Sequence, residues 1–383
     1  METYLRGYAE GILFALDTLG RPARDLAQRE KAPLQRFTIV YPPTVPWEHQ
    51  CVQRPHHLMR AFARRGHNVV FVDSTGGKKP FSPEPCLTVA PDLEEVSRGL
   101  KDLRDPVVLW VSCPGTMGPS LKLQPDLVVY DIIDEPVGEL VSWLRGLPEL
   151  QERADCCVAV TPALRSYATG KPTILGPNGV WLDHFSPGPP VAPPGWPTGS
   201  LGARPVVGYW GALERWVDLE LLVQIAQGRP AYDFVVIGPE YGRDEAKRRF
   251  AAARNIHWVG PQPHQDLPQW GRCFDVGILP FKRTPLTDTC DPIKVREYLA
   301  LGLPVVATDL PSLAETPSIQ CASDLRTWLS ALDTAVEERQ RDEALRAKLR
   351  GQRRDSVREF DWQRIADRCL EHLDRVWKEK QRG

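Results

Sequence analysis

The stretch FDVGILPFKRTPLTDTCDPIKVREYLALGLPVVATD, residues 274–309, decides the fold. It contains an apolar run, a polar loop, a short amphipathic segment and a second apolar run. Pro292 predicts the start of a helix, and Gly302 followed by Pro304 predicts its end. This order of strand, loop, helix and strand is typical of an open α/β sheet, in which ligands bind at the carboxyl ends of the strands.

Two charged side chains stand where such a ligand would bind. Lys294 lies in the first turn of the predicted helix, and Glu297 lies one helical step further along the same face. A cation beside free helix-terminal amides suits a pyrophosphate. A carboxylate can accept paired hydrogen bonds from two ribose hydroxyls. The stretch therefore predicts a nucleotide site.

Outward from this stretch, strand-like and helix-like segments alternate along most of the chain. The strongest break in composition is the Pro- and Gly-rich segment at residues 186–205. Alternation on both sides of it predicts two doubly wound α/β domains facing each other. We place a helical extension at 1–35, an acceptor-side domain at 36–190, a linker or extended surface loop at 191–204, a nucleotide-sugar domain at 205–355 and a C-terminal helix at 356–383.

Composition narrows the functional class. The 383 residues include 48 Lys and Arg against 49 Asp and Glu, so a nucleic-acid-binding role, which normally requires a basic excess, is disfavoured. The nine cysteines form no CxxC pair, and no metal triad is evident. No apolar run approaches the roughly 20 residues that span a bilayer. We expect a cytoplasmic protein, with contact at the inner face of the membrane left open, and an unknown oligomeric state.

Seven segments carry a family resemblance. The stretch above resembles the donor-site motif of GT-B glycosyltransferases, particularly the GT4-like group and its teichuronic-acid-type bacterial members. Six further segments fit the same group in the same order: VQRPHHLMRAFARRGHNVVFVD, DLVVYDIIDE, ERADCCVAVTPAL, LGPNGVWLDHF, VVGYWGALERWVDLELL and FVVIGPE. The resemblance implies an α/β fold of GT-B architecture, with two Rossmann-like domains across a cleft.

The resemblance also implies an activity. It indicates a hexosyltransferase type of enzyme, which moves a sugar from a UDP- or GDP-linked donor to a glycan, lipid-linked or protein hydroxyl. Retention at the anomeric carbon, no metal and no other cofactor are expected, in a role in polysaccharide biosynthesis of the cell envelope. A sugar-nucleotide 2-epimerase of the same fold and a catalytically silent partner subunit are the alternatives.

On the donor side, Glu297 resembles the second Glu of the family's paired-glutamate motif, which contacts the ribose. Thr289 stands where the first Glu is expected, with Asp288 and Asp291 as the nearest carboxylates, and Asp291 is assigned to the donor site.

The family's phosphate-binding Arg is also replaced, because Ala212 follows Gly211. We expect Lys294 and Arg215 to supply the charge and Gly211 to allow close backbone approach. Gly238 and Glu240 are expected to line the nucleobase or ribose pocket.

On the acceptor side, Asp131 and Asp134 end a predicted strand and are assigned as catalytic, together with Lys294. A carboxylate there can act as a general base or stabilise positive charge on the anomeric carbon. The alternative for Asp131 is a turn cap or a pair with an arginine. Arg54 and His57 are assigned to the acceptor side, with an ion pair and a packing role as their respective alternatives.

The first 20 residues have an amphipathic pattern. Leu5, Tyr8, Ile12, Leu16 and Leu19 fall near one helical face. A helix on the membrane surface would suit a lipid-linked acceptor, but the polar face lacks a basic excess. Docking onto the body of the enzyme, or a dimer contact, is the preferred interpretation.

Overall fold

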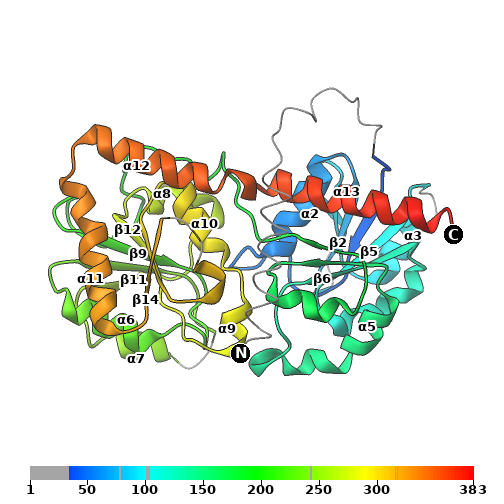
Figure 1. Ribbon diagram of the computed structural model, residues 1–383, viewed down its shortest axis with the longest axis horizontal. Coiled ribbons are helices and arrows are strands. Elements are labelled where there is room, and N and C mark those ends of the chain that lie inside the picture. The colour runs from blue at the N-terminus through cyan, green and yellow to red at the C-terminus, as the bar shows by residue number, and fades with distance from the viewer. Residues whose placement is uncertain (1–33, 77–78, 101–103, 242–243, 315, 317) are drawn as a thin grey trace.

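The computed structural model describes residues 34–76, 79–100, 104–241, 244–314, 316 and 318–383 (Figure 1). The predicted N-terminal extension therefore lies outside the described residues, apart from its last two. Strands and helices alternate in two bodies, as the sequence predicts.

The first domain is built on an eight-stranded sheet in the order β3-β4-β2-β1-β5-β6-β7-β8. All neighbours are parallel except the β3–β4 pair. Runs such as LVVYDI in β6 are fully buried, as parallel strands covered on both faces require. The strands are β1 (Thr38–Tyr41), β2 (Asn68–Val72), β3 (Phe81–Glu84), β4 (Leu87–Ala90), β5 (Val107–Val111), β6 (Leu127–Ile132), β7 (Cys156–Ala159) and β8 (Thr173–Leu175). The helices are α2 (Arg54–Arg64), α3 (Leu93–Leu100), α4 (Met117–Ser120) and α5 (Leu147–Arg153).

The second domain carries a six-stranded parallel sheet in the order β11-β10-β9-β12-β13-β14. Its strands are β9 (Val206–Trp210), β10 (Asp233–Ile237), β11 (Ile256–Trp258), β12 (Val276–Leu279), β13 (Val305–Thr308) and β14 (Ile319–Ala322). Its helices are α6 (Leu219–Gly228), α7 (Glu245–Phe250), α8 (Leu267–Gly271), α9 (Pro285–Thr289), α10 (Ile293–Ala300), α11 (Leu325–Val336) and α12 (Glu343–Ser356). The stretch that opened the sequence analysis forms β12, α9, α10 and β13, with Pro292 as the N-cap of α10.

The chain crosses between the domains twice, and the two crossings lie side by side. The first follows β8, within residues 176–185, and the second joins α12 to the last helix, α13 (Trp362–Lys380). Val180 accepts a backbone hydrogen bond from Trp362 at 3.2 Å and donates one to Phe360 at 2.8 Å. Gly179 is required here, because a Cβ would lie 2.7 Å from the Phe360 carbonyl oxygen.

The predicted linker at 191–204 has a different position from the one expected. It lies against the second domain, where the Trp196 ring packs 5.7 Å from Trp270 and the Cys273 thiol lies 3.4 Å from the Val191 carbonyl oxygen. Because Trp196 packs against the second domain, the segment is an extended surface loop of that domain. A surface loop was the second interpretation of its composition. The chain crosses from the first domain to the second before this loop begins, within residues 176–185.

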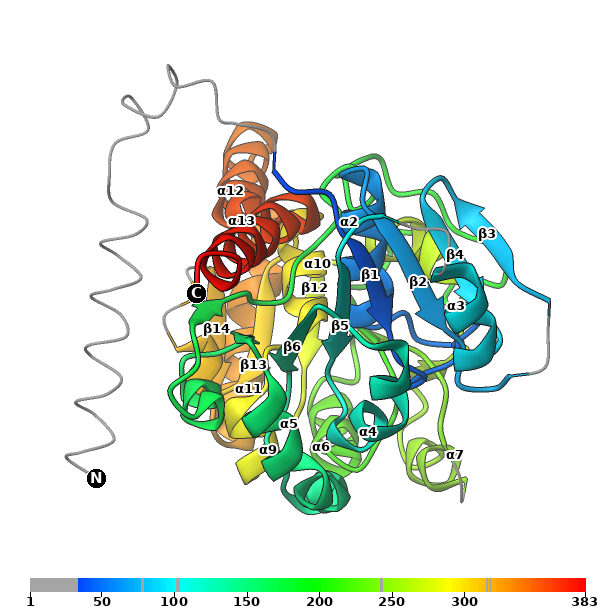
Figure 2. The same ribbon diagram turned by 90° about the vertical axis from the view of Figure 1, so that its right-hand side faces the viewer.

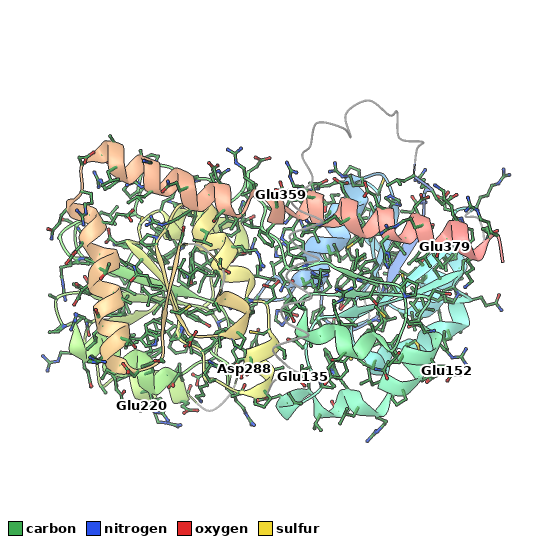
Figure 3. All side chains as sticks on the ribbon, in the orientation of Figure 1. Glu135, Glu152, Glu220, Asp288, Glu359 and Glu379 are labelled. Atoms are coloured by element: carbon green, nitrogen blue, oxygen red, sulfur yellow. The ribbon has the colours of Figure 1, made fainter. Side chains whose placement is uncertain are left out.

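Helix α13 returns to the first domain, on which it lies in Figures 1 and 2. Glu359 and Glu379 mark the two ends of this run in Figure 3. Its apolar stripe joins the core of that domain, with Trp362, Ile365 and Leu370 at most 1% exposed against α2 and the sheet. The apolar stripe of α13 thus docks onto the first domain. Within the described ranges, none of the helices has the length and apolarity that a bilayer crossing needs.

Candidate active site

A cleft of about 350 Å³ lies between the two domains. The first domain contributes residues 50–55 and 133–134, and the second contributes the carboxyl-end loops of β9 and β10 together with the start of α10. This is the position at which open α/β sheets bind ligands. A larger cavity of about 780 Å³ lies at the opposite edge, where Asp275 and Pro304 precede β12 and β13. The cleft is therefore the better candidate for the site.

Two glycines that line this cleft, Gly211 and Gly238, allow close contacts with each other's backbone and with the side chain of Lys294. Gly211 and Gly238 follow β9 and β10 with φ of +135° and +140°. A Cβ on Gly238 would lie 2.0 Å from the Gly211 carbonyl oxygen, and a Cβ on Gly211 would lie 2.6 Å from Cε of Lys294. Among the described residues, the side chain that approaches Gly211 closely is that of Lys294. The expected approach of a donor phosphate to this backbone stays a prediction.

Lys294 presents a cation that the described residues leave without an ion pair within 4.0 Å. Its Nζ lies 5.2 Å from the centre of the Phe281 ring and 5.8 Å from that of Tyr209. Burial lowers the pKa of Lys294, while Cys51 and Glu297 oppose that effect. An ammonium held among rings without a carboxylate partner is suited to receive an anionic ligand.

Glu297 lines the same cleft and is already hydrogen-bonded. Its Oε2 accepts from Trp210 Nε1 at 2.7 Å, and its Oε1 lies 3.2 Å from His264 Nε2. The Trp210 backbone amide donates to the Tyr298 hydroxyl at 3.0 Å. These contacts fix the carboxylate in one orientation, in which its remaining lone pairs are the acceptors left for a ligand.

Asp291 joins the donor-side helix to the interdomain crossing. Its Oδ2 accepts from the Asn178 amide at 2.6 Å, and its Oδ1 accepts from Arg296 at 2.5 Å. Asn178 Nδ2 donates to the Asp291 carbonyl oxygen at 2.6 Å. Although Asp291 lines the cleft, its carboxylate serves the domain junction.

Thr289, at the position of the missing carboxylate, does not replace it. Its hydroxyl is directed to carbonyl oxygens of its own helix at 3.2 and 3.4 Å, and its own carbonyl accepts from Thr161. Asp288 is paired with Arg283 at 2.5 Å. Figure 3 shows Asp288 on α9 and Glu135 after β6 at the domain junction, where Glu135 accepts from the Tyr167 hydroxyl.

The two predicted catalytic aspartates occupy different environments. Asp131 is 2% exposed and forms a bidentate pair with Arg54, at 2.8 and 2.9 Å. Arg54 also donates to the Pro177 carbonyl oxygen and to Asn178 Oδ1. The pairing of Asp131 with an arginine, which was its alternative interpretation, is the one found. The ion pair is buried, whereas an ordinary surface pair was the alternative for Arg54.

Asp134 lies in the cleft wall beside Cys290. Burial raises the pKa of Asp134 to about 7. Throughout the described chain it has no hydrogen bond and no ion pair. A carboxyl group that changes charge near neutral pH and has no partner is suited to proton transfer.

His57 is packed beneath the cleft, as its alternative interpretation proposed. Its ring stacks on Trp362 at 5.1 Å, and its Nδ1 accepts from Trp181 Nε1 at 3.0 Å. Burial lowers the pKa of His57 well below its usual value, so the ring is neutral with its proton on Nε2. That Nε2 is buried without a partner in the described part of the chain.

His57, His264 and Glu297 place potential metal ligands within 4.8 Å of one another. A ligating His usually donates through its second ring nitrogen, whereas Nδ1 of His57 accepts a hydrogen bond. Nε2 therefore retains its proton and cannot bind a cation. The chemistry of this set fits a hydrogen-bonded cluster and does not fit a metal site.

Two predicted donor residues do not line the cleft. Arg215 is exposed, and Glu240 accepts from the Ala246 amide at 2.8 Å in the first turn of α7. Their neighbours Trp216 and Pro239 line the cleft instead.

Sequence reasoning missed the contribution of the loop after β1. Cys51 lines the cleft, and the ring of His49 lies 6.1 Å from that of Tyr241 in the second domain. The reach of this loop across the cleft depends on tertiary structure, which no local pattern reveals. His264 was also missed, since no pattern near it indicates a contact with Glu297.

Parts of the chain are similar in sequence to known proteins. Residues 204–336 match the family model described as glycosyl transferases group 1. A putative teichuronic acid biosynthesis glycosyltransferase, TuaH of Bacillus subtilis, is 31% identical over 111 residues, which are 29% of this chain and 28% of that protein. The lipopolysaccharide core biosynthesis mannosyltransferase LpsB of Rhizobium meliloti is 29% identical over 164 residues, which are 36% of this chain and 43% of that protein. The chain thus spans less than half of either curated relative.

Solved structures extend the likeness to most of the chain. Sucrose-phosphate synthase of Thermosynechococcus elongatus aligns with 90% of this chain and 100% of its own, with a TM-score of 0.68 and 18% identity. HepE of Anabaena, in complex with UDP and glucose, aligns with 88% of this chain and 99% of its own, with a TM-score of 0.64 and 13% identity. The chain has the GT-B fold of glycosyltransferases, and its second domain matches the group 1 glycosyl transferase family.

Proposed function

We propose that this protein is a glycosyltransferase that takes a sugar from a nucleotide-linked donor bound in the interdomain cleft. The observation that carries the proposal is the Lys294 ammonium, held against Gly211 at the start of α10 with no ion pair among the described side chains. The first amides of α10 lack acceptors within the helix and add positive potential beside it. The UDP complex of HepE, which shares the fold, supports a UDP-linked donor.

The roles follow from the cleft geometry. The bond between the anomeric carbon and the phosphate oxygen breaks, and the nucleoside diphosphate leaves with the electron pair. Lys294 stabilises the charge that develops on it. Glu297, fixed by Trp210, accepts hydrogen bonds from the ribose hydroxyls.

The acceptor oxygen bonds to the anomeric carbon, and its proton passes to the Asp134 carboxylate. The lack of a partner for Asp134 leaves its oxygens available for that step. Retention and independence of metal are proposed on the resemblance to the GT4-like group, as is a glycan, lipid-linked or protein hydroxyl as the acceptor.

The test uses the full chain with UDP, GDP and their glucose and mannose derivatives. We expect calorimetry to show nucleotide binding and chromatography to show slow release of free sugar, with water replacing the acceptor. Conversion of the donor into an isomeric sugar nucleotide would indicate the epimerase instead. Absence of binding for every nucleotide would indicate a silent subunit.

A further inference from the structure

A largely apolar groove of about 670 Å³ runs along the outer edge of the first domain. One wall is the edge strand β8 with its flanking prolines, and the other is α13. At the base, His372 Nε2 lies 3.3 Å from the Pro172 carbonyl oxygen. The apolar lining comes from Ile174, Leu175, Pro177, Phe360 and Val376.

The rim of the groove is basic by one charge. Arg165 lines the rim from the segment before β8, whereas Arg368, Glu371, Arg375 and Glu379 all belong to α13. His372 adds no charge near neutral pH, because burial lowers its pKa. An apolar floor beside an edge strand is a surface that proteins normally cover.

The described chain begins on the same helix. The Gln35 amide donates to Asp374 Oδ1 at 3.1 Å, and Leu34 lies beside Trp377. Residues 20–33 can extend at most about 45 Å, whereas the 19 residues of α13 span about 28 Å. Residues 1–19 can therefore reach any point along the groove.

The sequence of residues 1–19 complements this groove. The five apolar residues of the stripe already described, from Leu5 to Leu19, recur at spacings of three and four. A helix of that length would be about as long as α13. Glu2, Glu10 and Asp17 outnumber the single Arg6, so the segment is acidic where the groove rim is basic.

We propose that residues 1–19 dock in cis, as an amphipathic helix, along the groove between β8 and α13. The apolar stripe covers Ile174, Leu175 and Val376, and the acidic face lies toward the arginines of the rim. The segment thereby shields the edge of the eight-stranded sheet from pairing with other chains.

Hydrogen–deuterium exchange of the full chain tests this docking. In Leu16→Asp, which places a charge in the apolar stripe, we expect amides of residues 172–177 to exchange about tenfold faster or more, because exchange reports the open population. Thr18→Asp introduces the same charge on the opposite helical face and serves as the matched control, with exchange unchanged. Arg375→Glu, on the exposed rim, should act in the same direction as Leu16→Asp, and the double variant should add little.

Three results would overturn the proposal. The first is unchanged exchange at β8 in both Leu16→Asp and Arg375→Glu. The second is protection that rises with protein concentration together with a dimer in sedimentation, which would assign the groove to a second copy. The third is loss of binding to phosphatidylglycerol–phosphatidylethanolamine vesicles in Leu16→Asp without any change at β8, which would assign the segment to a membrane.

Discussion

Asn178 and Asp291 are joined by two hydrogen bonds of 2.6 Å, one from the Asn178 backbone amide and one from its side chain. Asn178 belongs to the first crossing between the domains, and Asp291 precedes the helix that carries Lys294 and Glu297. The contact therefore couples the domain junction to the proposed donor site.

Asn178→Ala removes only the side-chain bond of this pair. We expect a loss of about 1–3 kcal/mol in the free energy of unfolding, because the buried Asp291 carbonyl loses its donor. Chemical denaturation measures it. The affinity for the donor should also fall in this variant. If calorimetry showed an unchanged affinity for UDP, the domain junction would not be coupled to the donor site.

Lys294→Met tests the proposed phosphate contact while keeping the length of the side chain. We expect kcat to fall by about 10²–10³-fold, since a preorganised charge on the leaving group is lost. Arg215→Ala is the matched control, because Arg215 is exposed outside the cleft lining. Equal losses in the two variants would contradict the placement of the phosphates.

Glu297→Gln tests the ribose contact. Gln can still accept from Trp210 through its single oxygen, but its amide group then faces His264. Because the ribose hydroxyls lose a charged acceptor, UDP affinity should fall by about tenfold. Inorganic pyrophosphate has no ribose, so its affinity should stay unchanged in this variant. A loss of pyrophosphate affinity as well would indicate damage to the phosphate site.

Asp134 predicts a pH profile. Its pKa of about 7 means that the carboxylate is protonated as the pH falls below neutrality, so kcat/KM should decline toward acid pH. Asp134→Asn should lose most activity and the acidic limb together. If kcat/KM of this variant still declined toward acid pH as in the wild type, the titrating group would be another residue.

The raised pKa of Asp134 also affects stability, but a rise in pH lowers stability whereas it raises activity. A raised pKa in the folded protein means that the native state binds more protons than the unfolded state between about pH 4 and 7. Folding stability is therefore lost as the pH rises through this window. At pH 8, Asp134→Asn should be more stable than the wild type by up to about 4 kcal/mol, and at pH 4 most of that difference should be gone.

Gly238→Ala tests the close backbone approach of Gly238 and Gly211, which directly follow the parallel strands β10 and β9. The new Cβ would lie 2.0 Å from the Gly211 carbonyl oxygen, at a φ of +140°. We expect a destabilisation above about 4 kcal/mol or failure to fold. Gly66→Ala is the control: its φ is +83° with no atom within 4 Å of the Cβ, so about 1 kcal/mol is expected.

The spacing of apolar residues and the positions of Pro and Gly predicted the strands and helices of the fold well. Buried runs such as VVGYW and LVVYDI became parallel strands, and Pro292 begins the helix that was expected. These features are local, so a sequence records them directly. The position of the domain crossing was missed, because Pro and Gly density also marks a loop that Trp196 anchors to one domain.

The site was predicted less completely, for a physical reason. Lys294, Glu297, Asp134 and the two glycines line the cleft, but the partners of Asp131 and Glu297 lie 77 and 87 positions away in the chain. Whether a carboxylate is available or already paired is decided by such distant contacts. No local pattern in the sequence pairs Arg54 with Asp131 or Trp210 with Glu297.

The return of α13 to the first domain sets an order for folding during synthesis. Trp362, Ile365 and Leu370 belong to the same core as Phe62 and Trp110, although they are synthesised after the whole second domain. The first domain thus emerges from the ribosome with an incomplete core, while the second domain can close its own sheet beforehand. At about 5–20 residues per second, the first domain exposes part of its apolar core for many seconds, and exposed apolar surface of this kind is prone to aggregation.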